Sequence, residues 1–404
     1  MIARRILLLA LVLVIVAVWW ASGLGRVPAD PRRFFSEQEI ARANDYQGPR
    51  YVAYAIGTIL GLAVLAVLAF TSVGDLLLRP VRSWPRPLAA TGAVVLTTVA
   101  VAVVRVPVSF WRGYVHERAW GFSTQTLAGW FSDWGKALGV SVVISALVLT
   151  GLVALIRFFP RAWPSLAVVA GAAVVVLLTY LAPVVLEPLF NRFEPLEDRE
   201  LAAQLTELAD RAGVPVREVL VADASRRTTK ENAYVSGFGT TRRLVVYDTL
   251  LKKADRDEIV LVVAHELGHR REHHVEWATA IGAAATAAGV LLLWLLLRSD
   301  AVLGAARAAA PADPRIVPFV IFLVAALNLL TLPPSNWLSR RFERSADSFA
   351  LQLTGDEDAY VRTERGLALR NLADLDPGPL TYRLLFTHPA PAERIALGAE
   401  VEPG

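Results

Sequence analysis

The sequence predicts a mainly helical, multi-pass membrane protein that carries polar segments. Of its 404 residues, 55% are hydrophobic and only 19% are charged, whereas about a quarter of the residues in soluble domains are charged. The apolar residues gather in seven long runs without a charged side chain in the middle. Because a run of about 20 apolar residues crosses the bilayer core as a helix, we expect about seven membrane spans.

The first apolar run, Ile6–Ser22, has two interpretations. Arg4 and Arg5 precede it, as in a secretory signal peptide. Its length, the Trp19-Trp20 pair and the lack of a small-residue cleavage site favour a retained helix. The remaining predicted spans are Tyr51–Val73, Leu88–Val104, Ala137–Phe158, Ser165–Leu186, Trp277–Leu297 and Ile316–Leu332.

The order of the spans divides the chain into four parts. Residues 1–190 form a membrane region of five spans, and its loop 105–136 is expected near the polar segments. Residues 191–276 and 336–404 are polar, and the two-span hairpin 277–335 separates them. A hairpin returns the chain to the side from which it left. Both polar segments therefore emerge on one face of the membrane and can build one site.

The composition narrows the chemistry that such a site can perform. There are no cysteines, which excludes disulfides, a thiolate nucleophile and a cysteine zinc site. The net charge of +4 comes from arginines scattered in loops. We see no basic stripe with interleaved aromatic residues, so we expect no nucleic-acid partner. Any metal must be bound by His, Asp or Glu.

The polar segment 191–276 contains a metal-binding motif. Residues 259–269 predict a helix, which Asp255 or Asp257 can cap. His265 and His269 are four residues apart, so both imidazoles stand on one helix face and can reach the same zinc ion. Glu266 lies beside them, in the position of a general base in the HExxH pattern.

A catalytic zinc site needs a third protein ligand. His273 lies one further turn along the same helix. Three ligands in a straight row on one helix do not match three corners of a tetrahedron around one ion, so His273 is a poor candidate. The longer motif HExxHxxGxxH is excluded, because Glu272 and Val275 stand where it requires glycine and histidine.

The remaining candidate for the third ligand is Glu343, in a helical stretch after the hairpin. Asp347 follows one turn later on the same face and can orient a ligand histidine. The alternative is a solvated charged face formed with Arg340 and Arg344. The HExxH motif on the same side of the membrane favours Glu343 as the ligand.

Several further blocks of sequence accompany these residues. They are residues 117–123, 126–136 with Asp133, 188–198, 232–234, 246–250, 265–269, 341–347, 387–389 and 393–394. Together they resemble the integral-membrane gluzincins, which are the type 1 CAAX prenyl protease family and, more distantly, the bacterial heat-shock membrane metalloproteases. The resemblance covers about residues 114–398, and the seven spans match the CAAX protease branch better.

This resemblance implies a fold and further site residues. The family fold encloses a water-filled chamber within seven tilted membrane helices, and its zinc protease domain has a small β-sheet. Asn232, Ala233 and Tyr234 are implied as the edge strand on which a substrate peptide is laid. His388 is implied to steady the tetrahedral intermediate, and Arg394 to lie close to the site.

The expected function is hydrolysis of peptide bonds at one zinc ion, with Glu266 as the general base. The peptide or protein substrate is either a lipidated C-terminus, as in CAAX processing, or a damaged membrane protein subject to quality control. A non-catalytic metal-binding or transport protein, with His269, His273 and His274 as a metal-collecting patch, is the alternative. Transporters more often carry ionisable residues within their spans. The sequence leaves the oligomeric state open.

The orientation in the cell membrane has two interpretations. The resemblance implies that the polar segments face the cytoplasm, and we adopt that expectation. Short loops on the opposite face are rich in arginine, which by the positive-inside rule favours the reverse. These arginines are Arg79, Arg82, Arg86, Arg157 and Arg161.

Overall fold

The computed structural model describes residues 29–399. The first predicted span, Ile6–Ser22, lies outside the described residues. Within them, five helices are long and apolar enough to cross a membrane. They are α2 (Glu37–Phe70), α4 (Arg86–Phe110) with its extension to Ala119, α6 (Leu127–Phe158), α7 (Trp163–Val185) with α8 (Glu187–Phe190), and α12 (His274–Leu297).

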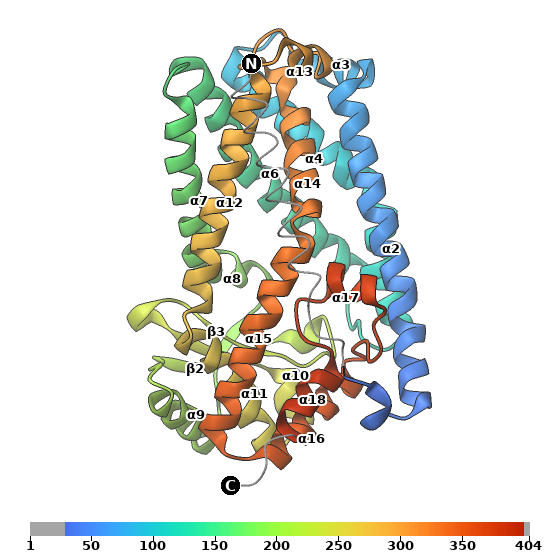
Figure 1. Ribbon diagram of the computed structural model, residues 1–404, viewed down its shortest axis with the longest axis vertical. Helices are drawn as coiled ribbons and strands as arrows, with labels where there is room; N and C mark the ends of the chain where they lie inside the picture. The colour runs from blue at the N-terminus through green and yellow to red at the C-terminus, as the bar shows by residue number, and fades with distance from the viewer. Residues whose placement is uncertain (1–28, 400–404) are drawn as a thin grey trace.

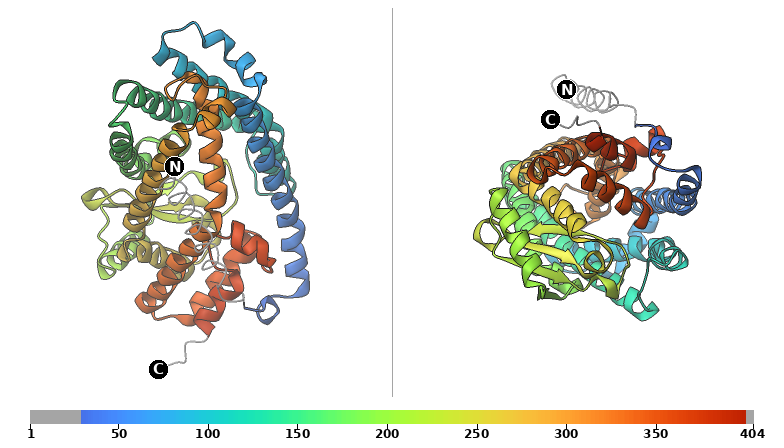
Figure 2. Two further views of the ribbon diagram at one scale, coloured as in Figure 1. Left: turned by 45° about the horizontal axis from the view of Figure 1, so that its top comes forward. Right: turned by 90° about the horizontal axis from the view of Figure 1, so that it is seen from below.

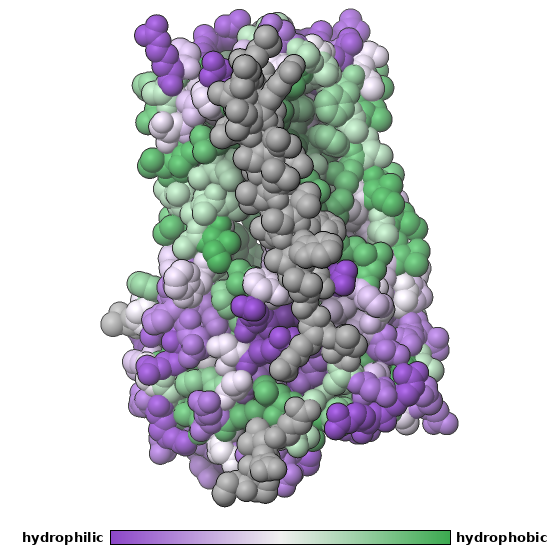
Figure 3. Space-filling view, viewed as in Figure 1, coloured by the Kyte–Doolittle hydropathy of each residue, from purple (hydrophilic) through white to green (hydrophobic). Residues whose placement is uncertain are grey.

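A sixth candidate span is bent. The helix α14 (Val317–Leu330), with the 3₁₀ turn η6 (Pro314–Ile316) before it, meets α15 (Leu332–Thr354) at 51°. The six predicted spans after the first therefore all lie on helices that are long and apolar enough to cross a membrane, the bent pair included. Figure 3 shows an apolar band over the helical part of the molecule and hydrophilic surfaces on the part below it. The chain is a multi-pass membrane protein.

The helix α2 begins well before the predicted span that starts at Tyr51. Ser36 caps it, accepting from the backbone N–H of Glu39, while the Glu39 carboxylate accepts from the N–H of Ser36. This capping box starts the helix in a polar stretch that hydropathy alone does not mark. The polar first half of α2 runs beside the C-terminal segment (Figures 1 and 2), where Gln47 donates to the Leu372 carbonyl.

Short elements precede α2 or lie between the membrane helices. They are η1 (Pro31–Arg33), α3 (Ser72–Leu78), η2 (Arg79–Val81), the π-helical turn η3 (Trp111–Val115), α5 (His116–Ala119) and α13 (Asp300–Ala305).

The two polar segments lie together at one end of the molecule (Figure 1). The first contains β1 (Phe193–Pro195), α9 (Arg199–Arg211), β2 (Glu218–Ala222), η4 (Ala224–Arg226), β3 (Ala233–Ser236), η5 (Gly239–Thr241), β4 (Arg243–Tyr247), α10 (Asp248–Lys253) and α11 (Arg256–Arg271). The second continues α15 into α16 (Glu357–Arg370), α17 (Pro379–Leu385) and α18 (Pro391–Ala399).

The described strands form one mixed sheet in the order β1-β2-β4-β3. The β2 and β4 strands are parallel, and the other two pairs are antiparallel. The core between this sheet and the helices α9 and α11 contains the fully buried Leu205, Leu244, Val246, Val263 and Leu267. Because β3 pairs only with β4, its other side is a sheet edge within the described part of the chain.

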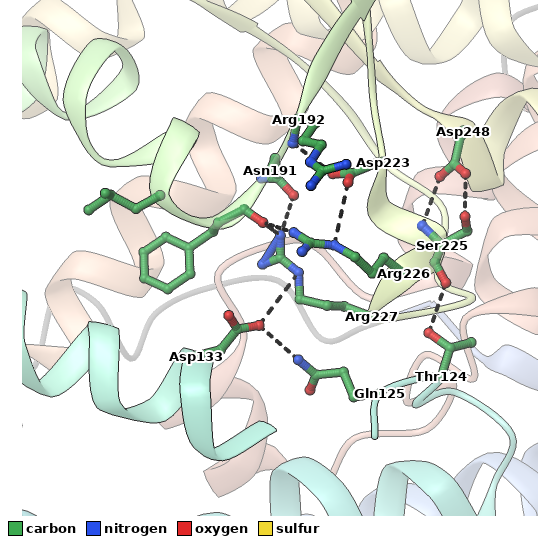
Figure 4. A network of polar contacts seen from close by, with 12 residues as sticks. Thr124, Gln125, Asp133, Asn191, Arg192, Asp223, Ser225, Arg226, Arg227 and Asp248 are labelled. Atoms are coloured by element: carbon green, nitrogen blue, oxygen red, sulfur yellow. Dashed lines mark hydrogen bonds and ion pairs between the residues drawn. The ribbon is translucent and has the colours of Figure 1, made fainter. Parts of the chain in front are cut away.

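A polar network ties the membrane region to the sheet (Figure 4). Gln125 donates to Asp133 at the start of α6 at 2.8 Å, and Asp133 faces Arg227 at 3.8 Å. Arg227 in turn donates to the Asn191 side chain at 2.6 Å. Thr124 donates to the Ser225 carbonyl at 2.8 Å. These contacts bring the predicted loop 105–136 against the polar domain.

Candidate metal centre

The HExxH segment is helical, as predicted. Asp255 caps α11 by accepting from the backbone N–H of Glu258 at 2.9 Å. His265 and His269 stand on one face, and their Nε2 atoms are 3.1 Å apart. His273 follows the helix in the left-handed conformation, with φ of 56°. It lies outside the cluster of potential metal ligands in the described residues.

Glu343 reaches the same point from α15, although the membrane helices α12 and α14 lie between α11 and α15 in the chain. Its Oε2 lies 3.3 Å from His265 Nε2, and its Oε1 lies 3.4 Å from His269 Nε2. Ligands on one tetrahedral zinc with bonds of 2.0–2.1 Å are about 3.3–3.4 Å apart. The three separations therefore fit one ion.

The protonation chemistry of the cluster also fits a cation. Glu343 is buried, and its Oε2 has no hydrogen-bond partner among the described residues, which is costly for a carboxylate unless a cation is present. Burial disfavours the charged form of His265, but Asp347 and Glu343 outweigh it and raise its pKa to about 10. A metal bound here replaces a proton. Burial lowers the pKa of His269 to about 3, so this imidazole is neutral.

Each ligand histidine is held through its other ring nitrogen. His265 Nδ1 lies 2.8 Å from Asp347 Oδ1, as expected for an orienting carboxylate. His269 Nδ1 lies 3.0 Å from Nδ1 of His274, a buried residue whose ring stacks on Phe342 at 4.3 Å. When the Nδ1 atoms of His265 and His269 each carry a proton, the Nε2 lone pairs of these two residues are free to bind a metal. The sequence gives no sign of this contact of His274, because nothing local distinguishes His274 from His273.

Arg394 in α18 connects Asp347, the carboxylate that orients His265, to the carboxylate of Glu364. Its Nε and Nη2 donate to Asp347 at 2.9 and 2.5 Å, and its Nη1 pairs with Glu364 of α16 at 2.8 Å. All three side chains are largely buried. Burial raises the pKa of Glu364 to about 7. Glu364 was also missed, since a charged residue on an amphipathic helix normally faces water.

The helices α11 and α15 approach closely at Gly268 inside the motif. A Cβ there would lie 3.0 Å from the Cα of Ala346 and 3.1 Å from its carbonyl oxygen. Only glycine fits this approach without displacing the neighbouring helix. The contact sets the distance between the two histidines and Glu343.

Glu266 and His388 lie beside the three ligands. Burial raises the pKa of Glu266 to about 7, which is suitable for a general base near neutral pH. His388 Nε2 is 3.4 Å from Glu343 Oε2, and its side chain is 59% exposed. Glu266 lines both a cavity of about 510 Å³ and another of about 290 Å³.

The strand β3 runs along the metal site from one cavity to the other. Asn232, just before it, is exposed and lines the larger cavity, whereas Val235 lines the smaller one. Ala233 is buried against the core. Tyr234 points away toward Glu187, to which its hydroxyl donates at 3.1 Å. Arg270 donates to the Val235 carbonyl at 2.5 Å.

A multi-pass helical body with an HExxH motif, whose two histidines form a ligand cluster with Glu343 of another helix, defines a membrane metalloprotease. The chain belongs to peptidase family M48, whose model matches residues 195–399. A model described as the CAAX prenyl protease N-terminal domain, with five membrane helices, matches residues 22–192.

Individual relatives agree with this assignment. The chain is 30% identical to the uncharacterized metalloprotease YhfN of Bacillus subtilis, over 91% of this chain and 87% of the relative. It is 29% identical to CAAX prenyl protease 1 of Saccharomyces cerevisiae, over 72% of this chain and 68% of that protein. The crystal structure of S. mikatae Ste24p shares the fold, with a TM-score of 0.81, 23% identity and coverage of 94% and 93%.

These findings confirm the predicted fold class and enzyme class. A metal-binding His-His-Glu site on an M48 protease is an enzyme site, so the alternative of a non-catalytic transport protein is wrong. A protease acts on peptides, and the membrane helices imply the bilayer as the surroundings.

Proposed function

We propose that this protein is a zinc-dependent endopeptidase that hydrolyses peptide bonds at the membrane. The observation that carries the proposal is the convergence of His265, His269 and Glu343, with ligand atoms separated as one tetrahedral ion requires. Two imidazoles and one carboxylate with an open position are a ligand set of catalytic zinc, and the HExxH helix is the zinc-binding motif of metalloproteases.

The protein's own residues have distinct tasks in this proposal. When bound, zinc would polarise the substrate carbonyl and acidify a water molecule. Glu266 accepts the proton of that water and then delivers it to the leaving nitrogen. His388 donates to the oxyanion of the tetrahedral intermediate. Asp347 and Arg394 fix the His265 ring, which keeps its Nε2 directed at the metal.

The substrate peptide is proposed to pair with the free edge of β3 at Asn232, Ala233 and Tyr234. Strand addition gives affinity through backbone hydrogen bonds whatever the side chains are. Antiparallel pairing is slightly more stable per residue than parallel pairing, so we take the peptide to run opposite to β3. Its C-terminal side then lies over the larger cavity.

The experiment that tests the proposed chemistry is the variant Glu266→Gln. We expect it to retain zinc, measured by elemental analysis, and to lose peptidase activity by about 10²–10⁴-fold or more. Glu272→Gln is the matched control, because Glu272 lies on the same chain segment but is exposed at the end of α11. Full activity of Glu266→Gln would end this mechanism.

Two substrate classes follow from the relatives. The name of the yeast relative indicates lipidated C-terminal peptides as substrates. The Bacillus metalloprotease matches over more of the chain and its name indicates no substrate, so damaged membrane proteins are the second class. Trapping substrates in membranes with Glu266→Gln, followed by mass spectrometry, distinguishes them. Prenylated C-termini among the captured proteins would support CAAX processing, and unmodified membrane proteins would support quality control.

We also propose that the metal site faces the cytoplasm. The chain has no cysteines, so single cysteines can report orientation without a prior substitution. Asp358 is exposed at the start of α16 in the second polar segment, and Arg82 lies in a loop between α2 and α4. The two variants to compare are Asp358→Cys and Arg82→Cys. In intact cells, an impermeant maleimide should label Arg82→Cys only. Labelling of Asp358→Cys alone would reverse the orientation.

A further inference from the structure

The cavity of about 510 Å³ extends from the metal site to a membrane helix. His265, Glu266 and Asn232 line it at one side, and Gln47 and Tyr51 of α2 line it at another. The loop between α16 and α17 completes this wall with Asp374. Part of the cavity that flanks the reacting groups therefore belongs to the membrane region.

The carboxylates on this cavity differ in their partners. Glu231 pairs with Arg370 at 3.0 Å, and Glu364 pairs with Arg394 at 2.8 Å. Asp374 is only 6% exposed, yet it forms no ion pair with any described residue. Its partners are the Tyr51 hydroxyl at 2.9 Å and the backbone N–H of Asp376 at 3.2 Å.

A buried carboxylate with neutral donors alone is energetically unfavourable. Burial raises the pKa of Asp374, and the hydrogen bond from Tyr51 opposes this only in part. A cation in the cavity would favour the charged form directly. Arg394 on the cavity wall cannot supply it, since it is already shared by Asp347 and Glu364. Arg370, which pairs with Glu231 of the wall, is likewise shared with Glu258.

We propose that Asp374 and Tyr51 form a specificity subsite that binds a positively charged side chain of the substrate, lysine or arginine. The cation pairs with the Asp374 carboxylate, while the Tyr51 hydroxyl holds that carboxylate in place. The inference rests on the proposed peptidase function and deepens it by naming a substrate class. The cavity has room for such a side chain together with the peptide backbone.

The position of the basic residue follows from the strand direction. Asn232, before the start of β3, lines the same cavity as Asp374, whereas Val235, near the end of β3, lines the other one. A peptide running opposite to β3 carries its C-terminal residues toward Asn232. The basic side chain therefore belongs to the C-terminal side of the bond that is cut.

The test uses quenched fluorescent peptides in matched pairs that differ only in arginine or the uncharged citrulline. The pair is moved through three positions on each side of a fixed cleavage site. For the wild-type holoenzyme in detergent, we expect kcat/KM to favour arginine about tenfold or more at a position C-terminal to the cut. In Asp374→Asn this ratio should fall to within about twofold of one.

The ratio is measured on a single enzyme sample, so a partly unfolded variant does not distort it. Asp376→Asn is the matched control, because that carboxylate is exposed and lies 3.6 Å from Arg32 outside the cavity. It should keep the wild-type ratio. Equal cleavage of both peptides by the wild type, an unchanged ratio in Asp374→Asn, or a preference on the N-terminal side would overturn the inference. Cleavage of neither peptide would instead overturn the proposed function.

Discussion

Replacing Asp347 with asparagine tests whether the carboxylate behind His265 controls the metal site. Asp347 is fully buried and accepts from His265 Nδ1 and from two nitrogens of Arg394. Asparagine has nearly the same shape but one acceptor oxygen, and its NH₂ group would face a donor. At least one charge-assisted hydrogen bond is lost, which costs about 1.5–3 kcal/mol.

The loss of folding stability in Asp347→Asn should stay below the ~3–5 kcal/mol that it costs to remove one partner of a buried ion pair. The reason is that Arg394 keeps its contact with Glu364. Zinc affinity should fall about 10–100-fold, as for other residues that orient a metal-binding histidine. Chelator competition measures the affinity, and thermal unfolding in detergent measures the stability. Asp358→Asn, on an exposed site, is the control. If Asp347→Asn binds zinc within twofold of the wild type, the orienting role is refuted.

Three further perturbations address the same site. Excess chelator should abolish activity and lower the unfolding temperature, since a ligand at a thousand times its Kd adds about 4 kcal/mol; zinc should restore both, and a chelator-resistant activity would argue against a metal enzyme. Gly268→Ala should cost about 1–3 kcal/mol and weaken zinc binding, because its Cβ would press on Ala346 and move the helix that carries Glu343; unchanged zinc affinity would contradict this. In a pH–rate profile, kcat/KM should fall as the pH drops through the pKa of Glu266, which burial raises to about 7 and bound zinc lowers, since only the deprotonated carboxylate is a base. Activity that rises on the acid side would exclude Glu266 from this role.

The ligand cluster could be predicted from sequence because helical spacing is a local signal and because few residue types in this chain can bind a metal. Helical spacing places His265 and His269 together, and the scarcity of histidine and absence of cysteine leave few candidates for the third ligand. Hydropathy likewise locates the apolar centres of the spans, since a bilayer imposes a minimum length. The structure brings Glu343 within 3.4 Å of both histidines.

What sequence reasoning missed depends on tertiary contacts. Glu364, His274 and Asp374 have ordinary local surroundings in the sequence, and only the packing of distant segments buries them. The start of α2 at Glu37 was missed for another reason. It is set by a cap in a polar stretch, where hydropathy gives no signal. The bend between α14 and α15 lies at Pro333 and Pro334, a proline signal that hydropathy does not register.

The division of the metal site between two segments affects when the enzyme becomes active during synthesis. His265 and His269 are translated before α12 and α14, and Glu343 and Arg394 after them. A nascent chain that has emerged only as far as α14 has the motif helix but neither the third ligand nor the arginine that neutralises Asp347. The cluster of metal-binding residues is therefore incomplete until the last membrane helix has inserted and the C-terminal segment has folded back. A product released by a stop before α15 would carry both histidines but lack Glu343.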